Sequence, residues 1–136
     1  MPADIGARAP RAVLDASALL AYLQRERGHA EVATVLENSA ISAVNLSEVL
    51  QKAMAAGVAT LGLESDLQAV GVRVHAFDAE DAASAAELWT RTRKLGLSLG
   101  DRACLALARR LRVPAYTADR AWTAVKVPGV VVRTVR

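Results

Sequence analysis

Four acidic residues occupy the same kind of position relative to the predicted secondary structure. Asp15 follows a short apolar run, and Glu48 lies in the first turn of a predicted helix. Asp101 opens another predicted helix, and Asp119 directly follows the fourth predicted strand. Helix starts and strand ends share one edge of a β-α-β sheet, so the four carboxylates are predicted to meet there. Carboxylates that share a crevice repel each other unless a cation lies between them.

This pattern predicts a particular chemistry. An all-oxygen acidic set suits Mg²⁺, with Mn²⁺ as a possible substitute. A metal ion held in this way lowers the pKa of a bound water and stabilises charge on a phosphate, so it serves phosphodiester hydrolysis. Ser17, two residues after Asp15, either orients that water or a carboxylate, or is an ordinary hydroxyl in the first turn of a helix.

Each acid also has a purely structural explanation. Asp15 is well placed to cap the helix that follows it. The run Asn45-Leu46-Ser47-Glu48 fits a capping box in which Asn45 starts the helix and Glu48 reaches back to it. Asp101 and Asp119 fit first-turn acids that the helix dipole favours. The sequence therefore leaves both interpretations open for every one of the four.

The elements that must position these residues alternate between strands and helices. Hydrophobic periodicity and Gly or Asp boundaries predict strands at about 11–15, 40–43, 72–77, 114–117 and 130–134. The same signals predict helices at about 17–27, 29–38, 45–57, 59–69, 78–95, 101–111 and 119–125. Strands separated by helices imply an α/β fold with a mainly parallel twisted sheet and helices on both faces, in three layers. The first and fourth strands are placed to flank the point where the strand order reverses.

Length and composition limit the class of protein. The 136 residues are 53% hydrophobic and 4% aromatic, which predicts one domain over 11–136 behind a flexible lead-in over 1–10. The net charge is +3, and 14 of the 17 basic residues are Arg, which suits phosphate binding or an ordinary solvated surface. The single Cys104 has no partner for an internal disulfide, and no apolar run is long enough to span a bilayer. These features, together with the lack of a signal-peptide pattern, predict a cytoplasmic protein without a membrane partner.

Four motifs in order resemble one known family. The segments 13–20, 45–49, 97–108 and 117–119 are similar to those of the PIN-domain ribonucleases, and in particular to VapC-type toxins of bacterial toxin–antitoxin pairs. A single Asp-x-Ser is weak support, whereas four motifs at the right spacing are specific. The resemblance covers the chain past residue 10.

The resemblance implies an Mg²⁺-dependent endoribonuclease that acts as the toxin of such a pair. Asp15, Glu48, Asp101 and Asp119 match the four acidic positions of the family, and Ser17 matches its hydroxyl position. Asp15 and Asp101 are then the expected direct metal ligands, while Glu48 and Asp119 complete the pocket directly or through water. The family also implies a homodimer, a VapB-type antitoxin that blocks the acidic pocket, and a structured RNA substrate such as tRNA.

Basic residues are the expected contacts to the RNA backbone. The candidates are Arg91, Arg93, Lys94, Arg102, Arg109 and Arg120. For Arg102, directly after Asp101, three roles stay open: pairing with a carboxylate, contacting phosphate or facing solvent. Since aromatic residues are few, base stacking is not the expected main contact, and recognition of backbone shape is favoured.

Two other classes of function compete with the nuclease. A receiver-like Mg²⁺-binding domain also gathers acids at a strand edge, but it would want a Lys at the end of the last strand, where 130–133 supply none. A catalytically silent PIN fold that only binds RNA or an antitoxin is the other alternative. The presence of all four acids argues against it.

Overall fold

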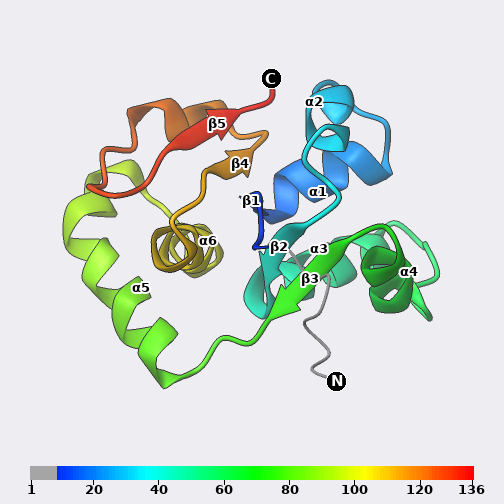
Figure 1. Cartoon of the computed structure of the whole chain (residues 1–136), viewed down its shortest axis with the longest axis horizontal. Helices are drawn as coiled ribbons and strands as arrows, with labels where there is room; N and C mark the ends of the chain where they lie inside the picture. Colours follow the sequence, from blue (N-terminus) through cyan, green and yellow to red (C-terminus); the bar gives the residue numbers. More distant parts are fainter. Residues whose placement is uncertain (1–8) are drawn as a thin grey trace.

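The structure is a computed structural model and describes residues 9–136 of the chain. The elements are β1 (Ala12–Leu14), α1 (Ala16–Leu23), α2 (His29–Ala33), β2 (Ser39–Ser42), α3 (Ala43–Ala55), α4 (Leu63–Ala69), β3 (Val72–His75), α5 (Ala79–Thr92), the 3-10 helix η1 (Arg93–Leu95), α6 (Leu99–Leu111), β4 (Ala115–Thr117), the 3-10 helix η2 (Arg120–Ala124) and β5 (Val132–Thr134) (Figure 1). Residues 1–8, and with them most of the predicted lead-in over 1–10, lie outside the described residues. No helix among the described residues is long and apolar enough to cross a membrane.

The five strands form one sheet in the order β3-β2-β1-β4-β5, and every neighbouring pair is parallel. The expected parallel α/β fold is therefore confirmed. The chain moves outward from β1 through β2 to β3, and then returns across the sheet to β4 on the other side of β1. The strand order thus reverses between β1 and β4, which is where an open α/β sheet forms a crevice at its carboxyl edge.

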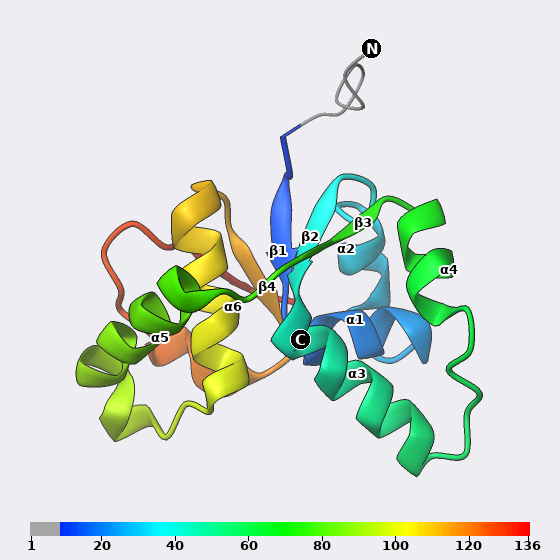
Figure 2. The ribbon, with the colours of Figure 1, turned by 90° about the horizontal axis from the view of Figure 1, so that it is seen from below.

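Helices cover both faces of this sheet. In Figure 2, α5 and α6 lie on one side of the strands, and α1, α3 and α4 lie on the other. The strands divide their side chains between the two layers: Leu14 and Ile41 pack with α1 and α3, whereas Val13 and Ala40 pack with α6. Both faces of the central strands are buried, which explains why they are apolar runs without polar alternation.

Two helices begin earlier than predicted. The predicted start of the third helix at residue 45 is wrong, because α3 begins at Ala43 directly after β2 and its N-cap is Ser42, whose hydroxyl accepts a hydrogen bond from the Val44 N–H. Likewise α6 begins at Leu99, two residues before the predicted start, with Ser98 as its cap. In both helices the acid of interest consequently lies farther inside the first turns than the sequence pattern indicated.

Candidate active site at the carboxyl edge

The four predicted acids line one cavity. It has a volume of about 140 Å³ and is formed by Asp15, Ala16, Ser17, Asn45, Glu48, Lys52, Asp101 and Asp119. These residues come from the ends of β1 and β4, from the first turns of α1 and α6, and from the first three turns of α3. The structure therefore brings together all five residues that the sequence singled out, and adds Asn45 and Lys52 to them.

Larger hollows lie elsewhere on the molecule, two of them beside the edge strands of the sheet. One of about 620 Å³ lies beside η2 and β5 and includes Arg91 and Lys126 but no acidic residue. The other, of about 760 Å³, lies around the β3 end of the sheet and contains one acid, Glu37. Size alone would favour these hollows, but neither contains more than one acid, whereas the small cavity gathers four, and a cluster of interacting ionisable groups is typical of a catalytic site.

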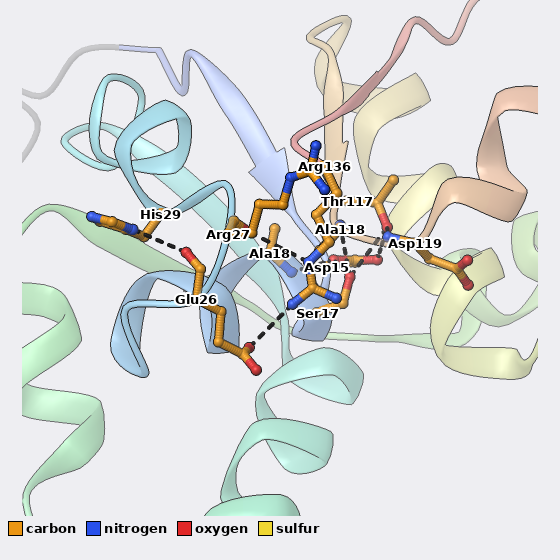
Figure 3. A network of polar contacts seen from close by, with 10 residues as sticks. All are labelled: Asp15, Ser17, Ala18, Glu26, Arg27, His29, Thr117, Ala118, Asp119 and Arg136. Atoms are coloured by element: carbon orange, nitrogen blue, oxygen red, sulfur yellow. Dashed lines mark hydrogen bonds and ion pairs between the residues drawn. The ribbon is translucent and has the colours of Figure 1, made fainter.

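Asp15 is the most buried acid of the cavity, with 4% of its surface exposed. Its Oδ1 accepts hydrogen bonds from the Ser17 hydroxyl at 2.7 Å and from the Ala18 N–H at 2.8 Å. Its Oδ2 accepts one from the Thr117 hydroxyl at 2.6 Å (Figure 3). The first contacts make Asp15 the N-cap of α1, so its structural interpretation is correct. A carboxylate oxygen has two lone pairs, so Oδ2 still has one to offer to another ligand.

The environment of Asp15 favours the protonated carboxyl group. The pKa of Asp15 is raised from the ordinary value of 3.8 to about 6, mainly because the carboxyl group is buried, and the negative charge of Asp101 contributes to this rise. The hydrogen bonds from Thr117, Ala18 and Ser17 oppose it, because donors stabilise the ionised form. A carboxylate that is held buried at this energetic cost is a common feature of functional sites.

Thr117 is a site residue to which the sequence pattern assigned no role. Besides donating to Asp15, its hydroxyl oxygen accepts a hydrogen bond from the Asp119 N–H at 3.0 Å. The Ser17 hydroxyl oxygen accepts one in the same way from the Ala118 N–H at 2.9 Å. Figure 3 shows these groups as one network that joins the end of β1 to the end of β4. Ser17 therefore orients a carboxylate, and Thr117 is its counterpart on the neighbouring strand.

Asp101 and Asp119 also have real capping roles. Asp101 and Ser98 form a capping box at the start of α6, in which Asp101 Oδ2 accepts the Ser98 N–H at 2.9 Å. Asp119 Oδ1 accepts the Ala121 N–H at 2.9 Å and caps η2. The two interpretations of these acids are thus compatible, because each carboxylate supports a helix start with one oxygen and lines the cavity as well.

Glu48 differs from the other three acids. The predicted capping box of Asn45 and Glu48 is wrong, because Ser42 caps α3 and Asn45 lies in the third position of the helix. Glu48 Oε1 instead accepts a hydrogen bond from Asn45 Nδ2 at 2.8 Å. No backbone N–H is bonded to Glu48 among the described contacts, so the start of a helix does not account for its place in the cavity.

The pKa of the buried Cys104 thiol is affected by the charges of the cavity. Cys104 is fully buried in α6, as expected for a core residue. Burial raises the pKa of its thiol well above the ordinary value, and the negative charges of Asp15, Asp101 and Glu48 raise it further. Three of the four carboxylates therefore lie close enough to Cys104 to raise the pKa of its thiol.

The donor atoms of the cavity fit a hard divalent cation in type. All four acids offer oxygen, and neither histidine nor the cysteine lines the cavity. As the side chains stand, however, no group of three or more His, Cys, Asp or Glu residues within 9–136 is arranged to hold a metal ion. The hydrogen bonds described above engage both carboxylate oxygens of Asp15 and one oxygen each of Glu48, Asp101 and Asp119. These side chains would have to rotate before several of their oxygens could share one cation.

The predicted RNA-contacting residues are placed differently from one another. Arg93 stacks over the exposed ring of Trp89, with its Cζ 5.6 Å from the ring centroid. Arg109 lies 4.0 Å from Glu87. Arg102 pairs with no carboxylate of residues 9–136, and its Nη1 instead donates to the Ala85 carbonyl at 2.8 Å, which links α6 to α5. The exposed candidates that remain are Arg91, Lys94 and Arg120.

Comparison with known proteins places the fold. The PIN domain family matches residues 12–128, which contain the sheet up to β4 and all four acids of the cavity. The chain belongs to the PIN-domain family. No curated protein matches the chain in sequence.

Solved structures with this fold include several toxin–antitoxin complexes. One from Klebsiella pneumoniae has 20% identity and a TM-score of 0.68, covering 88% of this chain and 95% of the other. A DNA-bound VapBC complex from Salmonella typhimurium has 13% identity and a TM-score of 0.63, with coverages of 93% and 99%. A member of the VapBC family from Mycobacterium tuberculosis has 21% identity and a TM-score of 0.59, with coverages of 92% and 99%. At these identities the similarity concerns the fold.

Proposed function

We propose that this protein is a divalent-metal-dependent endoribonuclease and the toxin of a toxin–antitoxin pair. The observation that carries the proposal is the gathering of Asp15, Glu48, Asp101 and Asp119 around one small cavity at the switch point of a PIN-domain sheet. Glu48 is decisive, because it caps no helix and yet lies in the cavity. Proteins of similar fold, reported as toxin–antitoxin complexes, support a VapB-type antitoxin as partner.

In this proposal Asp15 and Asp101 would hold Mg²⁺, or Mn²⁺ in its place, and Glu48 and Asp119 would complete the set directly or through water. The bound cation would neutralise the carboxylates, lower the pKa of a water and stabilise charge on a phosphodiester. The chain itself holds Asp15 in place through the hydroxyls of Ser17 and Thr117.

Basic residues account for substrate positioning in this proposal. Lys52 is exposed at the cavity and follows Glu48 by one turn of α3, so its ammonium group is placed to meet a phosphate oxygen. The exposed cations Arg91, Lys94 and Arg120 extend the positive surface that a structured RNA such as tRNA would contact. Hydrolysis would form a P–O bond to the water oxygen and break the P–O bond to the leaving oxygen, which takes up a proton that the water releases.

One observation favours a second candidate. Since the acids of residues 9–136 do not stand ready to hold a metal ion, the fold would also suit a silent module that binds RNA or an antitoxin without cleaving RNA. The receiver-like alternative is not supported, because the strand order β3-β2-β1-β4-β5 differs from the 2-1-3-4-5 order of receiver domains.

The deciding experiment is cleavage of total tRNA by the purified protein with and without Mg²⁺. We expect cleavage that EDTA abolishes and that Asp15→Asn and Asp101→Asn abolish. RNA binding without cleavage under all these conditions would favour the silent module. In cells, growth arrest on expression that a small neighbouring gene relieves would support the toxin role. Gel filtration would test the homodimer, and cell fractionation would test the cytoplasmic location that we infer.

A further inference from the structure

Asn45 joins the two helices that meet at the cavity. It is 1% exposed, and its Nδ2 donates to Glu48 Oε1 at 2.8 Å on α3 and to the Gly100 carbonyl at 3.0 Å on α6. Both partners only accept hydrogen bonds, so the amide nitrogen must face them. This contact spans 55 residues of sequence and fixes the carboxylate of Glu48 relative to α6.

The amide oxygen of Asn45 is left without a partner. Oδ1 is buried and accepts no hydrogen bond from the described residues, although Asn45 lines the cavity. Buried polar atoms of native proteins nearly always find a partner in protein, water or a ligand. An unpaired neutral oxygen among carboxylates therefore indicates that what occupies this cavity brings a hydrogen-bond donor or a positive charge.

Gly100 supplies the space that Glu48 needs. A Cβ atom at Gly100 would lie 2.5 Å from Glu48 Oε1 and 2.6 Å from its Cδ and Oε2. Such distances are far inside van der Waals contact, so the carboxyl group packs against the bare backbone of α6. Alanine forms helices better than glycine, and the helix itself gives no reason for glycine at this position.

We propose that Asn45 and Gly100 are positioning residues that hold the Glu48 carboxylate in the cavity. Asn45 holds one oxygen from the side of α3, and Gly100 leaves room for the whole group on the side of α6. Asn45 also offers Oδ1 to the occupant of the cavity. The inference rests on the proposed nuclease function for its catalytic consequence, but not for the contact itself.

Two variants change this arrangement in independent ways. Asn45→Leu removes both hydrogen bonds at similar side-chain volume. Gly100→Ala displaces the Glu48 carboxylate but removes no polar group from the site. Ser47→Ala, an exposed neighbour on the same turn of α3, is the matched control. Circular dichroism and thermal unfolding show which variants fold, and Gly100→Ala keeps the test valid if Asn45→Leu does not fold.

The first measurement needs neither metal nor RNA. In the ¹⁵N-labelled free protein, we expect the side-chain NH₂ signals of Asn45 to be protected from exchange, and to shift in Glu48→Gln and in Gly100→Ala. The second is calorimetry with MnCl₂ alone, where both variants should bind Mn²⁺ about tenfold more weakly than the wild type. The third is RNA cleavage, where kcat should fall at least tenfold with KM unchanged.

A double-mutant cycle separates positioning from general structural damage. Gly100 acts only through Glu48, whereas Asn45 also offers Oδ1 to the cavity, so Gly100→Ala should not lower kcat further in a Glu48→Gln background. Additive losses, or an Asn45 amide that exchanges freely and ignores Glu48→Gln, would overturn the proposal. A wild type that shows the NMR contact but cleaves no RNA would instead refute the nuclease function and leave the positioning contact intact.

Discussion

The hydroxyl of Thr117 donates a hydrogen bond of 2.6 Å to Asp15 Oδ2, across 102 residues of sequence. The same oxygen accepts the N–H of Asp119, so one side chain connects two acids of the cavity. This is possible because β4 pairs in parallel with β1, with Leu14 opposite Tyr116, and both strands end at the same edge. The stability of the protein and the pKa of Asp15 are therefore expected to depend on this hydrogen bond.

Thr117→Val should destabilise the protein and raise the pKa of Asp15 further. Valine has the shape of threonine but leaves Asp15 Oδ2 and the Asp119 N–H without their partner, at a cost of about 1–3 kcal/mol. Urea unfolding and ¹³C titration of the Asp15 carboxyl group measure the two effects. Thr90→Val, which removes an exposed hydroxyl on α5, should change neither, and equal stability of the two variants would contradict the role of Thr117.

The burial of Asp15 makes metal-free stability dependent on pH. Its pKa is higher in the folded protein, at about 6, than the 3.8 of an ordinary Asp, so the folded state binds the proton more tightly between these values. The free energy of unfolding should therefore fall as the pH rises from about 4 to 6, and stay low above that range. At 1.36 kcal/mol per pKa unit, the contribution is about 2–3 kcal/mol.

Asp15→Asn tests this dependence. In EDTA, the free energy of unfolding of the variant, relative to the wild type, should rise by about 2 kcal/mol between pH 4 and pH 7.5, because Asn has no proton to lose. For the control variant Asp66→Asn, at an exposed position in α4, the free energy of unfolding should depend on pH as it does in the wild type. Parallel curves for Asp15→Asn as well would show that Asp15 does not titrate as its burial implies.

Glu48→Gln should separate stability from activity. Glu48 caps no helix, and the Gln oxygen can still accept the Asn45 N–H, so unfolding should change by no more than about 0.5 kcal/mol. Cleavage of RNA should fall by about 100-fold or more, since a ligand charge is lost. Asp101→Asn should lose activity and also stability, because one of its oxygens belongs to the capping box of α6. An active Glu48→Gln protein would remove the main support for the nuclease proposal.

Arg102→Met should weaken the packing of α5 on α6 without affecting RNA. The variant keeps the aliphatic part of the side chain and loses the hydrogen bond to the Ala85 carbonyl, at a cost of about 1 kcal/mol. Thermal unfolding measures the loss, and filter binding of tRNA should give an unchanged Kd. A weaker Kd for Arg102→Met than for the wild type would instead assign Arg102 to the RNA surface.

Most of the fold follows from local sequence signals, and part of the site does not. Alternating apolar runs and helix boundaries predict the strands around residues 13, 41, 73, 116 and 132, and helix starts at one edge predict where the acids gather. The pattern Asn45-x-x-Glu48 was misleading because it matches a capping box, whereas β2 continues into α3 without a loop and Ser42 takes the cap. The roles of Asn45 and Thr117 depend on contacts to Gly100 and Asp15, and these depend on how distant elements pack.

The insertion of β4 between β1 and β5 has a consequence for biosynthesis. A chain made from its amino terminus has Asp15, Glu48 and Asp101 available first, but it lacks Asp119 and the hydroxyl that steadies Asp15 until β4 has left the ribosome and docked. An unfinished polypeptide therefore has an open edge at β1 and an incomplete acidic cavity. The order in which the strands are translated would therefore delay completion of the proposed active site until the last part of the domain has been made.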